Sequence, residues 1–356
     1  MHLQRALVAS LVLVTTCSMA ACSAIGGSDE PTANETTGQI KDVVLVTHDS
    51  FALPKGLIKK FEKDTGYHLV VRQNGDAGEL TNKLVLTTNS PLGDVSFGVD
   101  NTFASRALDN HVFEAYDGTL PAGADAYRLE GSDQVVPIDT ASVCVNVDTA
   151  WYAAHQQTPP QTLDDLADPA YHDQLVVEGA PTSSTGFAFL LATIAAKGDG
   201  WQDYWTRLMA NGTKVDAGWE DAYYVDFTGG GGKAATRPIV VSYDSSPAFT
   251  IDQASGKSTT KALLDTCFRQ TEYAGILAGA DNPAGAKAVI DFLLSPQVQA
   301  ALPESMYVFP VADGTPLPAE WAKWAVQPTS TLDVSAADID ANRDDWLNDW
   351  TDVITK

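Results

Sequence analysis

The chain has 356 residues, an apolar content of 44% and a formal net charge of −24 at pH 7. This length predicts two domains or one large one, with a sizeable hydrophobic core. The acidic balance argues against a nucleic-acid backbone as a partner, because such partners bind to basic surfaces. We attribute most of the charge to solubility outside the cell, and it is also compatible with a cationic ligand.

Residues 1–22 have the pattern of an export signal. A basic start precedes an apolar run over residues 6–14, which is too short for a lasting membrane span. Small residues before Cys22 resemble the lipobox of bacterial lipoproteins, which predicts a lipid on Cys22; cleavage of an ordinary signal near Ala21 is the alternative. Residues 23–40 are polar and predict a disordered tether. We therefore expect a protein anchored to the outer face of the cell membrane.

From residue 42 onward, runs with the spacing of strands alternate with runs that have the spacing of helices. Strand, helix, strand, helix and strand over residues 42–99 predict a parallel sheet with right-handed crossovers. Asp76 stands where the N-cap of the second helix is expected. The expected strands are 42–47, 67–72, 94–99, 135–147, 174–177, 214–215, 237–242, 272–277 and 306–311, and the expected helices are 54–64, one after Asp76, 101–108, 187–196, 201–209, 284–294, 296–302 and one from residue 335 onward.

Three of these strands, 135–147, 237–242 and 306–311, are interpreted as crossings between two lobes. The expected fold class is α/β, with a ligand cleft between the lobes. Two lobes joined by strand crossings, in an exported chain, are typical of a solute-binding protein that closes like a hinge. We expect a monomer in which lobe 1 holds residues 41–140 and 243–308, and lobe 2 holds residues 141–242 and 309–356.

Cys144 and Cys267 lie outside the export signal. In an oxidising compartment they form either a disulfide or two buried free thiols. The six histidines lack metal-ligand spacing and there is no Cys-x-x-Cys motif, so the sequence predicts no metal site and no cofactor. It has no Gly-x-Ser-x-Gly motif and no distinct carboxylate pair, so we expect a protein that is not an enzyme.

Ser183, Ser184, Thr185 and Gly186 open an apolar helix. The free amide groups at the start of a helix attract phosphate or carboxylate, and simple helix capping is the alternative. This stretch is therefore a candidate anion site.

Aromatic residues stand at the tips of several expected strands and helices, where they suit a flat ligand; core packing is the alternative. Nearby carboxylates would neutralise a cationic ring, and each has an alternative role as a cap or turn residue. The aromatic candidates are Trp219, Tyr223, Tyr224, Tyr243, Phe249 and Tyr307, and the acidic candidates are Asp76, Asp100 and Asp244.

Five ordered motifs resemble the thiamine-binding periplasmic proteins of ABC transporters. They are Thr-His-Asp-Ser-Phe at 47–51, Gly-Val-Asp-Asn at 98–101, Thr-Ser-Ser-Thr-Gly at 182–186, Gly-Trp-Glu-Asp-Ala-Tyr at 218–223 and Ser-Tyr-Asp-Ser-Ser-Pro-Ala-Phe at 242–249. The resemblance covers about residues 41–356. It implies a two-lobed type II binding fold that captures thiamine or its phosphates and hands them to a membrane permease.

The resemblance also implies which residues line the ligand. His48, Phe249 and Tyr307 depart from the family pattern, which has Tyr, Tyr and Trp at these positions, so flat rings remain while two phenol hydroxyls are lost. The alternatives are another small cationic or phosphorylated metabolite, or ferric iron bound through Tyr223 and Tyr224. By matched position the thiamine site would hold Asp76, Ser183, Trp219, Tyr243, Phe249 and Tyr307. The full set of predicted ligand-binding residues adds His48, Asp100, Ser184, Thr185, Gly186 and Tyr223.

Overall fold

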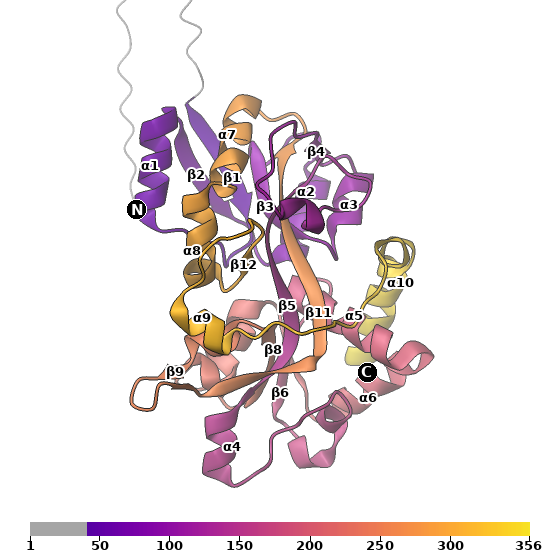
Figure 1. Ribbon diagram of the computed structural model, residues 1–356. Coiled ribbons are helices and arrows are strands. Elements are labelled where there is room, and N and C mark those ends of the chain that lie inside the picture. Colours follow the sequence, from indigo (N-terminus) through magenta and orange to yellow (C-terminus); the bar gives the residue numbers. More distant parts are fainter. Residues whose placement is uncertain (1–40) are drawn as a thin grey trace, which may run out of the picture. The chain divides into compact units, whose positions relative to one another are not determined.

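The computed structural model describes residues 41–356, and the predicted export signal, the lipidated Cys22 and the tether at 23–40 lie outside the described residues. A mixed sheet of ten strands organises this part of the chain (Figure 1). Its main strand order is β2-β1-β3-β11-β5-β8-β6-β7. Within residues 41–356, no helix has the length and apolar character needed to cross a membrane.

The first strand group, β1 to β3, is parallel as predicted. β1 (Asp42–Thr47) lies between β2 (His68–Gln73) and β3 (Val95–Asp100). The connecting helices are α1 (Lys55–Thr65) and α2 (Ala77–Leu86). The pattern of buried apolar residues in the strands and amphipathic helices between them explains this arrangement.

Two long antiparallel strands, β5 (Val136–Asp148) and β11 (Thr260–Leu277), run through the middle of the sheet (Figure 1). β11 pairs with β5 and then with β3, so it returns the chain to the first strand group. The expectation that segment 237–242 makes this return is therefore wrong. That segment forms β8 (Ile239–Tyr243), which pairs with β5 and β6 (Leu175–Glu178).

The strand expected at 272–277 is the last third of β11. The earlier residues of β11 include exposed charged side chains such as Lys261 and Asp265, so they lack the continuous apolar run that marks a buried strand. Both long strands run between the strand groups, and the predicted lobe boundaries therefore stay a prediction.

The second strand group, β6 to β8, is also parallel where β6 pairs with its neighbours. The helices α5 and α6 are longer than the helices expected at 187–196 and 201–209. Short strands and helical turns connect the longer elements. The remaining strands and α-helices, with the two helical turns η5 and η7, are β4 (Phe113–Glu114), α3 (Ala104–Asp109), α4 (Thr149–His155), α5 (Ser184–Lys197), α6 (Trp201–Ala210), β7 (Lys214–Asp216), η5 (Asp221–Asp226), η7 (Ser246–Phe249), β9 (Ile251–Asp252), β10 (Lys257–Ser258), α7 (Pro283–Leu293), α8 (Pro296–Met306), β12 (Phe309–Pro310), α9 (Ala319–Trp324) and α10 (Ala336–Ile354).

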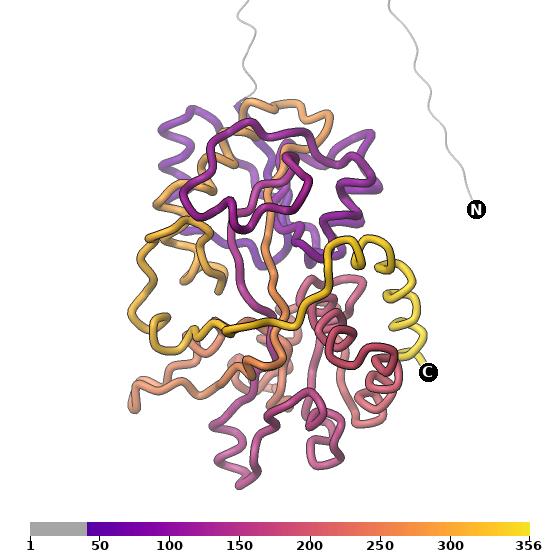
Figure 2. Tube along the Cα trace, turned by 45° about the vertical axis from the view of Figure 1, so that its right-hand side comes forward, coloured from indigo at the N-terminus to yellow at the C-terminus, as the bar shows by residue number. Residues whose placement is uncertain are grey.

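The C-terminal helix α10 touches elements on both sides of the long strands (Figure 2). Its Trp350 ring lies 5.4 Å from the ring of Trp205 on α6. Its Arg343 Nη1 donates a hydrogen bond to Ser105 Oγ on α3, at 3.0 Å. α10 therefore links α3, next to the first strand group, to α6, next to the second.

A disulfide joins Cys144 on β5 to Cys267 on β11. Both residues are buried, so the bond lies inside the sheet region rather than at its surface. Of the two alternatives for these cysteines, the structure has the disulfide.

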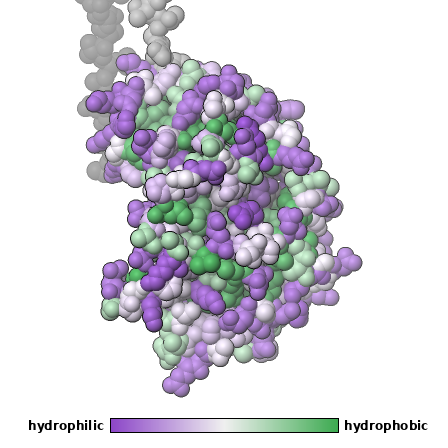
Figure 3. Space-filling view, viewed as in Figure 1, coloured by the Kyte–Doolittle hydropathy of each residue, from purple (hydrophilic) through white to green (hydrophobic). Residues whose placement is uncertain are grey.

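Polar residues cover most of the face shown in Figure 3, while apolar surface gathers at mid-height on this face.

Candidate functional site

Trp219 lies at the centre of an aromatic cluster. Its ring stacks on Tyr223 with centroids 4.9 Å apart, and lies 5.9 Å from Tyr243 and 5.7 Å from Tyr307. Its indole Nε1 donates a hydrogen bond to Ser242 Oγ at 2.9 Å. Four of the aromatic residues predicted from sequence are thus brought together.

A π-helical turn, η5, follows directly after Trp219. Such turns are rare and often lie at functional sites. Here the turn places Tyr223 against Trp219 and leaves Tyr224 41% exposed. The Tyr224 hydroxyl donates to the hydroxyl of Tyr307 at 2.9 Å, so Tyr224, which the family resemblance does not place in the thiamine site, joins the cluster.

Two positions that depart from the family pattern contact each other. The ring of Phe249 on η7 stacks on Tyr307, with centroids 3.4 Å apart and planes 20° from parallel. Behind them, the Trp321 ring on α9 lies 5.8 Å from Phe249. Phe249 and Tyr307 therefore act as one flat wall, which α9 supports.

A row of buried carboxyl groups crosses three neighbouring strands. Glu272 on β11 lies opposite Asp100 on β3 and Asp139 on β5. Residues that oppose each other in antiparallel strands point to the same face of the sheet. His48, just after β1, joins the row because its Nε2 lies 3.2 Å from Glu272 Oε1.

Burial has a large effect on these groups. It raises the pKa of Asp100 to about 7 and raises the pKa of Asp139 well above its ordinary range, and the charge of Glu272 adds to both effects. For His48, burial acts to lower the pKa, but the carboxylates around it, Glu272 first, leave the pKa raised. The row is therefore a buried site that favours protons or another cation.

Sequence reasoning missed Asp139 and Glu272. Asp139 is the one charged residue in the apolar run at 135–147, and an isolated charge in such a run is the signal that could have found it. Glu272 gave no comparable signal, because the strand that holds it was recognised only from residue 272 onward.

Gly98 makes room for His48. A Cβ atom at Gly98 would lie 2.1 Å from Cδ2 of the imidazole, and the residue has a φ of +108°, which side-chain-bearing residues rarely adopt. The Gly-Val-Asp-Asn motif therefore has a direct structural role.

Asp76 caps α2 as predicted, and it also reaches across to Trp219. One carboxylate oxygen accepts from the Ala77 amide at 2.6 Å, and the other accepts from the Trp219 amide at 2.9 Å. Beside it lies a cavity of about 200 Å³, which we call the Asp76 cavity. Its lining has no lysine or arginine and includes the carboxylates of Asp49, Asp76, Glu79, Glu220 and Asp221.

The candidate anion stretch, Ser183 to Gly186, is buried at the start of α5. Ser183 Oγ and Thr185 Oγ1 are 2.9 Å apart and hydrogen-bond each other. A Cβ atom at Gly186 would lie 2.5 Å from the backbone oxygen of Glu178, so the helix start packs directly on the end of β6.

Glu178 gives this helix start an acidic neighbour. Its side chain is fully buried, and neither carboxyl oxygen has a hydrogen-bond partner among residues 41–356. Burial raises its pKa well above the ordinary range, and the charge of Asp76 raises it further. An anion at the free amides of α5 would therefore lie beside this buried carboxyl group, and the anion site stays a prediction.

Asp244, the remaining acidic candidate, does not line the Asp76 cavity. Its buried carboxyl accepts from the Ser142 amide at 3.2 Å, and it borders a separate cavity described below. Its predicted role beside a cationic ring stays a prediction.

The chain is similar to known proteins in its sequence and in its fold. Residues 90–328 match the family model for bacterial extracellular solute-binding proteins. The chain belongs to this family. As a bacterial extracellular solute-binding protein it has the α/β fold of type II periplasmic binding proteins, and its family is not enzymatic.

Three known proteins are similar to the chain over most of its length. The thiamine-binding periplasmic protein of Escherichia coli is 28% identical over 322 residues, covering 88% of this chain and 94% of that protein. The thiamine-binding periplasmic protein of Brucella suis is 27% identical over 325 residues, covering 88% and 92%. A solved structure of a periplasmic thiamin binding protein matches with a TM-score of 0.77 and 28% identity, covering 88% of this chain and 96% of that one.

Proposed function

We propose that this solute-binding protein captures thiamine outside the cytoplasm and delivers it to the permease of an ABC importer. The observation that carries the proposal is a cluster of aromatic rings around Trp219 beside a buried row of carboxyl groups. Tyr243 connects the two, because burial and then the charge of Glu272 raise the pKa of its hydroxyl. Thiamine joins two flat rings, one of them a cationic thiazolium, so it matches both features. The names of the relatives from E. coli and Brucella support the same ligand.

In the proposed complex the thiazolium ring lies against Trp219 and near the carboxylates of Asp76 and Glu272. A cation over a Trp ring contributes about 0.5–2 kcal/mol. The aminopyrimidine ring stacks on Tyr243 or on the wall of Phe249 and Tyr307. The ligand then contacts residues of both strand groups, and this favours closure through its differential affinity for the closed state.

Thiamine needs more space to enter than the Asp76 cavity provides. The Asp76 cavity measures about 200 Å³, below the range of about 300–1,000 Å³ that is usual for ligand pockets. Two hydrogen bonds narrow it, from the Trp219 amide to Asp76 and from the Glu79 amide to the Thr182 oxygen at 3.1 Å. We infer that these contacts separate when thiamine enters and form again around it.

We further infer that unphosphorylated thiamine is preferred to its phosphate esters. A phosphate at the start of α5 would approach the buried Glu178 and the nearby Asp76. A carboxyl group that ionises at this place repels a phosphate and opposes the attraction that the helix amides supply. Phosphate esters would therefore bind less tightly than thiamine.

Ferric iron is the rival ligand, through Tyr223 and Tyr224. Iron is bound by tyrosinate, and burial raises the pKa of both hydroxyls above their ordinary value. Deprotonating both tyrosines beside a row of carboxyl groups is therefore costly. The same surroundings favour a preformed organic cation.

The lipid on Cys22 also remains part of the proposal. It would hold the protein at the outer face of the membrane, near its permease, and we expect the protein to act there as a monomer. Mass spectrometry of the N-terminal peptide from exported protein would show a diacylglycerol adduct on Cys22. An unmodified N terminus after residue 21 would contradict the anchor and leave the ligand proposal intact.

The central experiment is a calorimetric titration of the exported chain with thiamine, thiamine monophosphate, thiamine diphosphate and ferric citrate. We expect thiamine to bind most tightly. Trp219→Ala should weaken thiamine binding by about tenfold or more, while Trp151→Ala on α4, outside the cluster, should leave it unchanged. Heat from ferric citrate alone, with a visible charge-transfer band, would overturn the proposal.

A further inference from the structure

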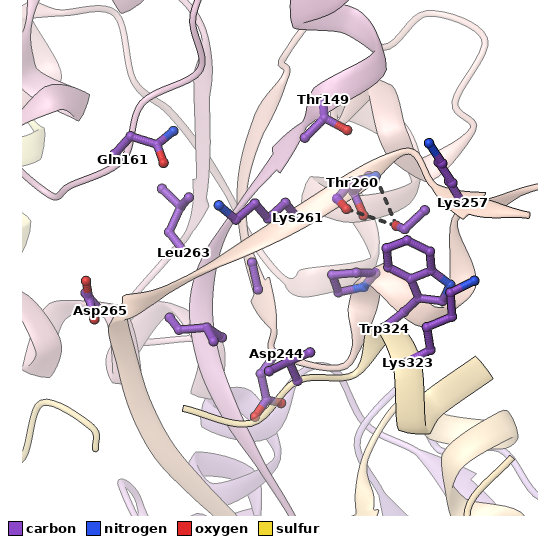
Figure 4. A pocket seen from close by; sticks show the side chains of 15 residues that line it. Thr149, Gln161, Asp244, Lys257, Thr260, Lys261, Leu263, Asp265, Lys323 and Trp324 are labelled. Atoms are coloured by element: carbon purple, nitrogen blue, oxygen red, sulfur yellow. Dashed lines mark hydrogen bonds between the residues drawn. The ribbon is translucent and has the colours of Figure 1, made fainter. Parts of the chain in front are cut away.

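A second cavity lies apart from the Trp219 cluster. It measures about 710 Å³, within the usual size range of small-molecule sites. Its lining comes mainly from β10, from the early part of β11, from η7 and the residues before it, and from the C-terminal end of α9, together with Thr149 and Gln161 (Figure 4). We call it the Lys261 cavity. None of its lining residues belongs to the aromatic cluster or to the carboxyl row.

Three lysines line this cavity: Lys257, Lys261 and Lys323. The concentration is unusual in a chain with 22 Lys and Arg against 46 Asp and Glu. In the part of the chain that the structure describes, the ammonium groups of Lys257 and Lys261 have no carboxylate at ion-pair distance. Their charge is therefore available to a ligand.

The two acidic residues at this cavity do not cancel that charge. Asp265 is exposed at its edge. Asp244 is fully buried and already accepts a hydrogen bond from the Ser142 amide, and burial raises its pKa to about 6. An anion in the cavity would therefore meet more positive than negative charge.

The wall of the cavity is apolar and includes one large flat ring. Trp324 is half-buried, and its Nε1 finds no acceptor among the described residues. Lys323 Nζ lies 4.8 Å from the centroid of the same ring. Figure 4 shows Lys257, Lys323 and Trp324 on one side of the cavity, with Lys261 and Gln161 toward the other. Leu263, Leu264, Pro247 and Val326 complete the apolar lining.

We propose that the Lys261 cavity binds a small aromatic carboxylate. The ring of the ligand lies against the Trp324 indole and the leucine side chains, and its carboxylate pairs with the lysines. A carboxylate supplies acceptors where the unmatched groups of the cavity are mainly donors. A planar ring is favoured over an aliphatic chain because stacking on an indole adds to simple burial.

The test uses three probes that share one ring system: indole-3-acetate, neutral indole-3-acetamide and cationic tryptamine. Binding to the exported chain is followed by calorimetry and by ligand-detected NMR. We expect indole-3-acetate to bind about tenfold or more tightly than the acetamide, and tryptamine to bind more weakly still. Equal binding of the acetate and the acetamide would overturn the proposal.

Variants locate the binding. The double variant Lys257→Gln, Lys261→Gln should weaken indole-3-acetate by about tenfold, and the matched variant Lys233→Gln, which removes an exposed lysine elsewhere, should not. Trp324→Leu should weaken all three probes. Unchanged affinity in the double variant would contradict the assignment.

Trp219→Ala separates this site from the proposed thiamine site. This variant should keep its affinity for indole-3-acetate while it loses thiamine. If thiamine failed to bind the wild type, the affinity for indole-3-acetate would still test the Lys261 cavity independently.

Discussion

The carboxylate of Asp76 accepts a hydrogen bond from the backbone amide of Trp219, 143 residues further along the chain, at 2.9 Å. The same carboxylate caps α2 through Ala77. One side chain thus fixes a helix beside the first strand group to the aromatic cluster beside the second. A ligand that binds between these residues must either displace this bond or be enclosed by it.

Asp76→Asn removes the charge of this residue and one of its two hydrogen bonds. Asn keeps one acceptor oxygen and turns its NH2 group toward the other backbone amide, so we expect a loss of about 1 kcal/mol in stability and about tenfold weaker thiamine binding. Asp76→Ala should in addition lower the free energy of unfolding by about 1 kcal/mol through the lost cap. Calorimetry and urea unfolding measure the two effects. The control is Asp281→Asn at an exposed site, and wild-type affinity in Asp76→Asn would contradict a role for the charge.

The buried carboxyl row predicts how stability depends on pH. Burial raises the pKa of Asp100 to about 7 in the folded chain, against about 3.9 in an unfolded chain. The stabilising contribution of the protonated group is therefore fully present below the unfolded value and is lost as the pH rises through about 7. We expect the free energy of unfolding of the ligand-free protein to fall from about pH 5 to about pH 8, and Asp100→Asn to flatten part of that slope.

The same row predicts the opposite pH dependence for binding. Ionised Asp100 and Asp139 attract a cation more strongly than their protonated forms, so thiamine affinity should rise from about pH 5 to about pH 8. Titrations at several pH values, with Asp100→Asn alongside wild type, would show it. An affinity that falls with pH would place the cation away from this row.

Glu178→Gln tests the inferred preference for unphosphorylated thiamine. The substitution removes a carboxyl group at the start of α5 and keeps its size. Burial raises the pKa of Glu178, so the titration is made at a pH high enough to ionise this group. We then expect the affinity ratio of thiamine monophosphate to thiamine to rise by about tenfold, because the helix amides are less opposed. Glu220→Gln at the Asp76 cavity is the matched control. An unchanged ratio would mean that the phosphate does not reach α5.

Gly98→Ala tests the space that the structure reserves for His48. The added Cβ would lie 2.1 Å from the imidazole, at a φ of +108°. At Gly131, with a φ of +77°, the structure has nothing within 4 Å of such a Cβ, so Gly131→Ala isolates the backbone cost of about 1–2 kcal/mol. In urea unfolding, Gly98→Ala should cost clearly more than Gly131→Ala. Equal costs would show that His48 moves aside freely.

Local signals in the sequence were sufficient to predict most single helices and strands. Asp76 was predicted as the N-cap of α2, and Gly66, with a φ of +77°, ends α1 where the sequence predicted the end of a helix. These features depend on a few neighbouring residues, so a pattern in one stretch is enough to reveal them. The aromatic candidates were found for the same reason, since each stands at the tip of its own element.

Pairings over long distances were not visible in the same way. The first two-thirds of β11 were missed because that strand is held by β5, more than a hundred residues earlier, and not by an apolar run of its own. Glu272, the centre of the carboxyl row, was missed as a site residue because it is the first residue of the recognised part of β11 and its pairing with Asp100 and Asp139 is not visible in the sequence. The contact between Asp76 and Trp219 likewise depends on the folded arrangement of two distant segments.

The Cys144–Cys267 disulfide spans 123 positions of the chain, and the second strand group with Trp219 and Tyr243 lies between its two ends. That stretch is therefore a covalently closed ring within the chain. A protease that cuts one peptide bond inside it leaves both fragments on the same molecule. In an extracytoplasmic space, a nicked binding protein of this kind would keep its two parts together until a reductant opened the bond.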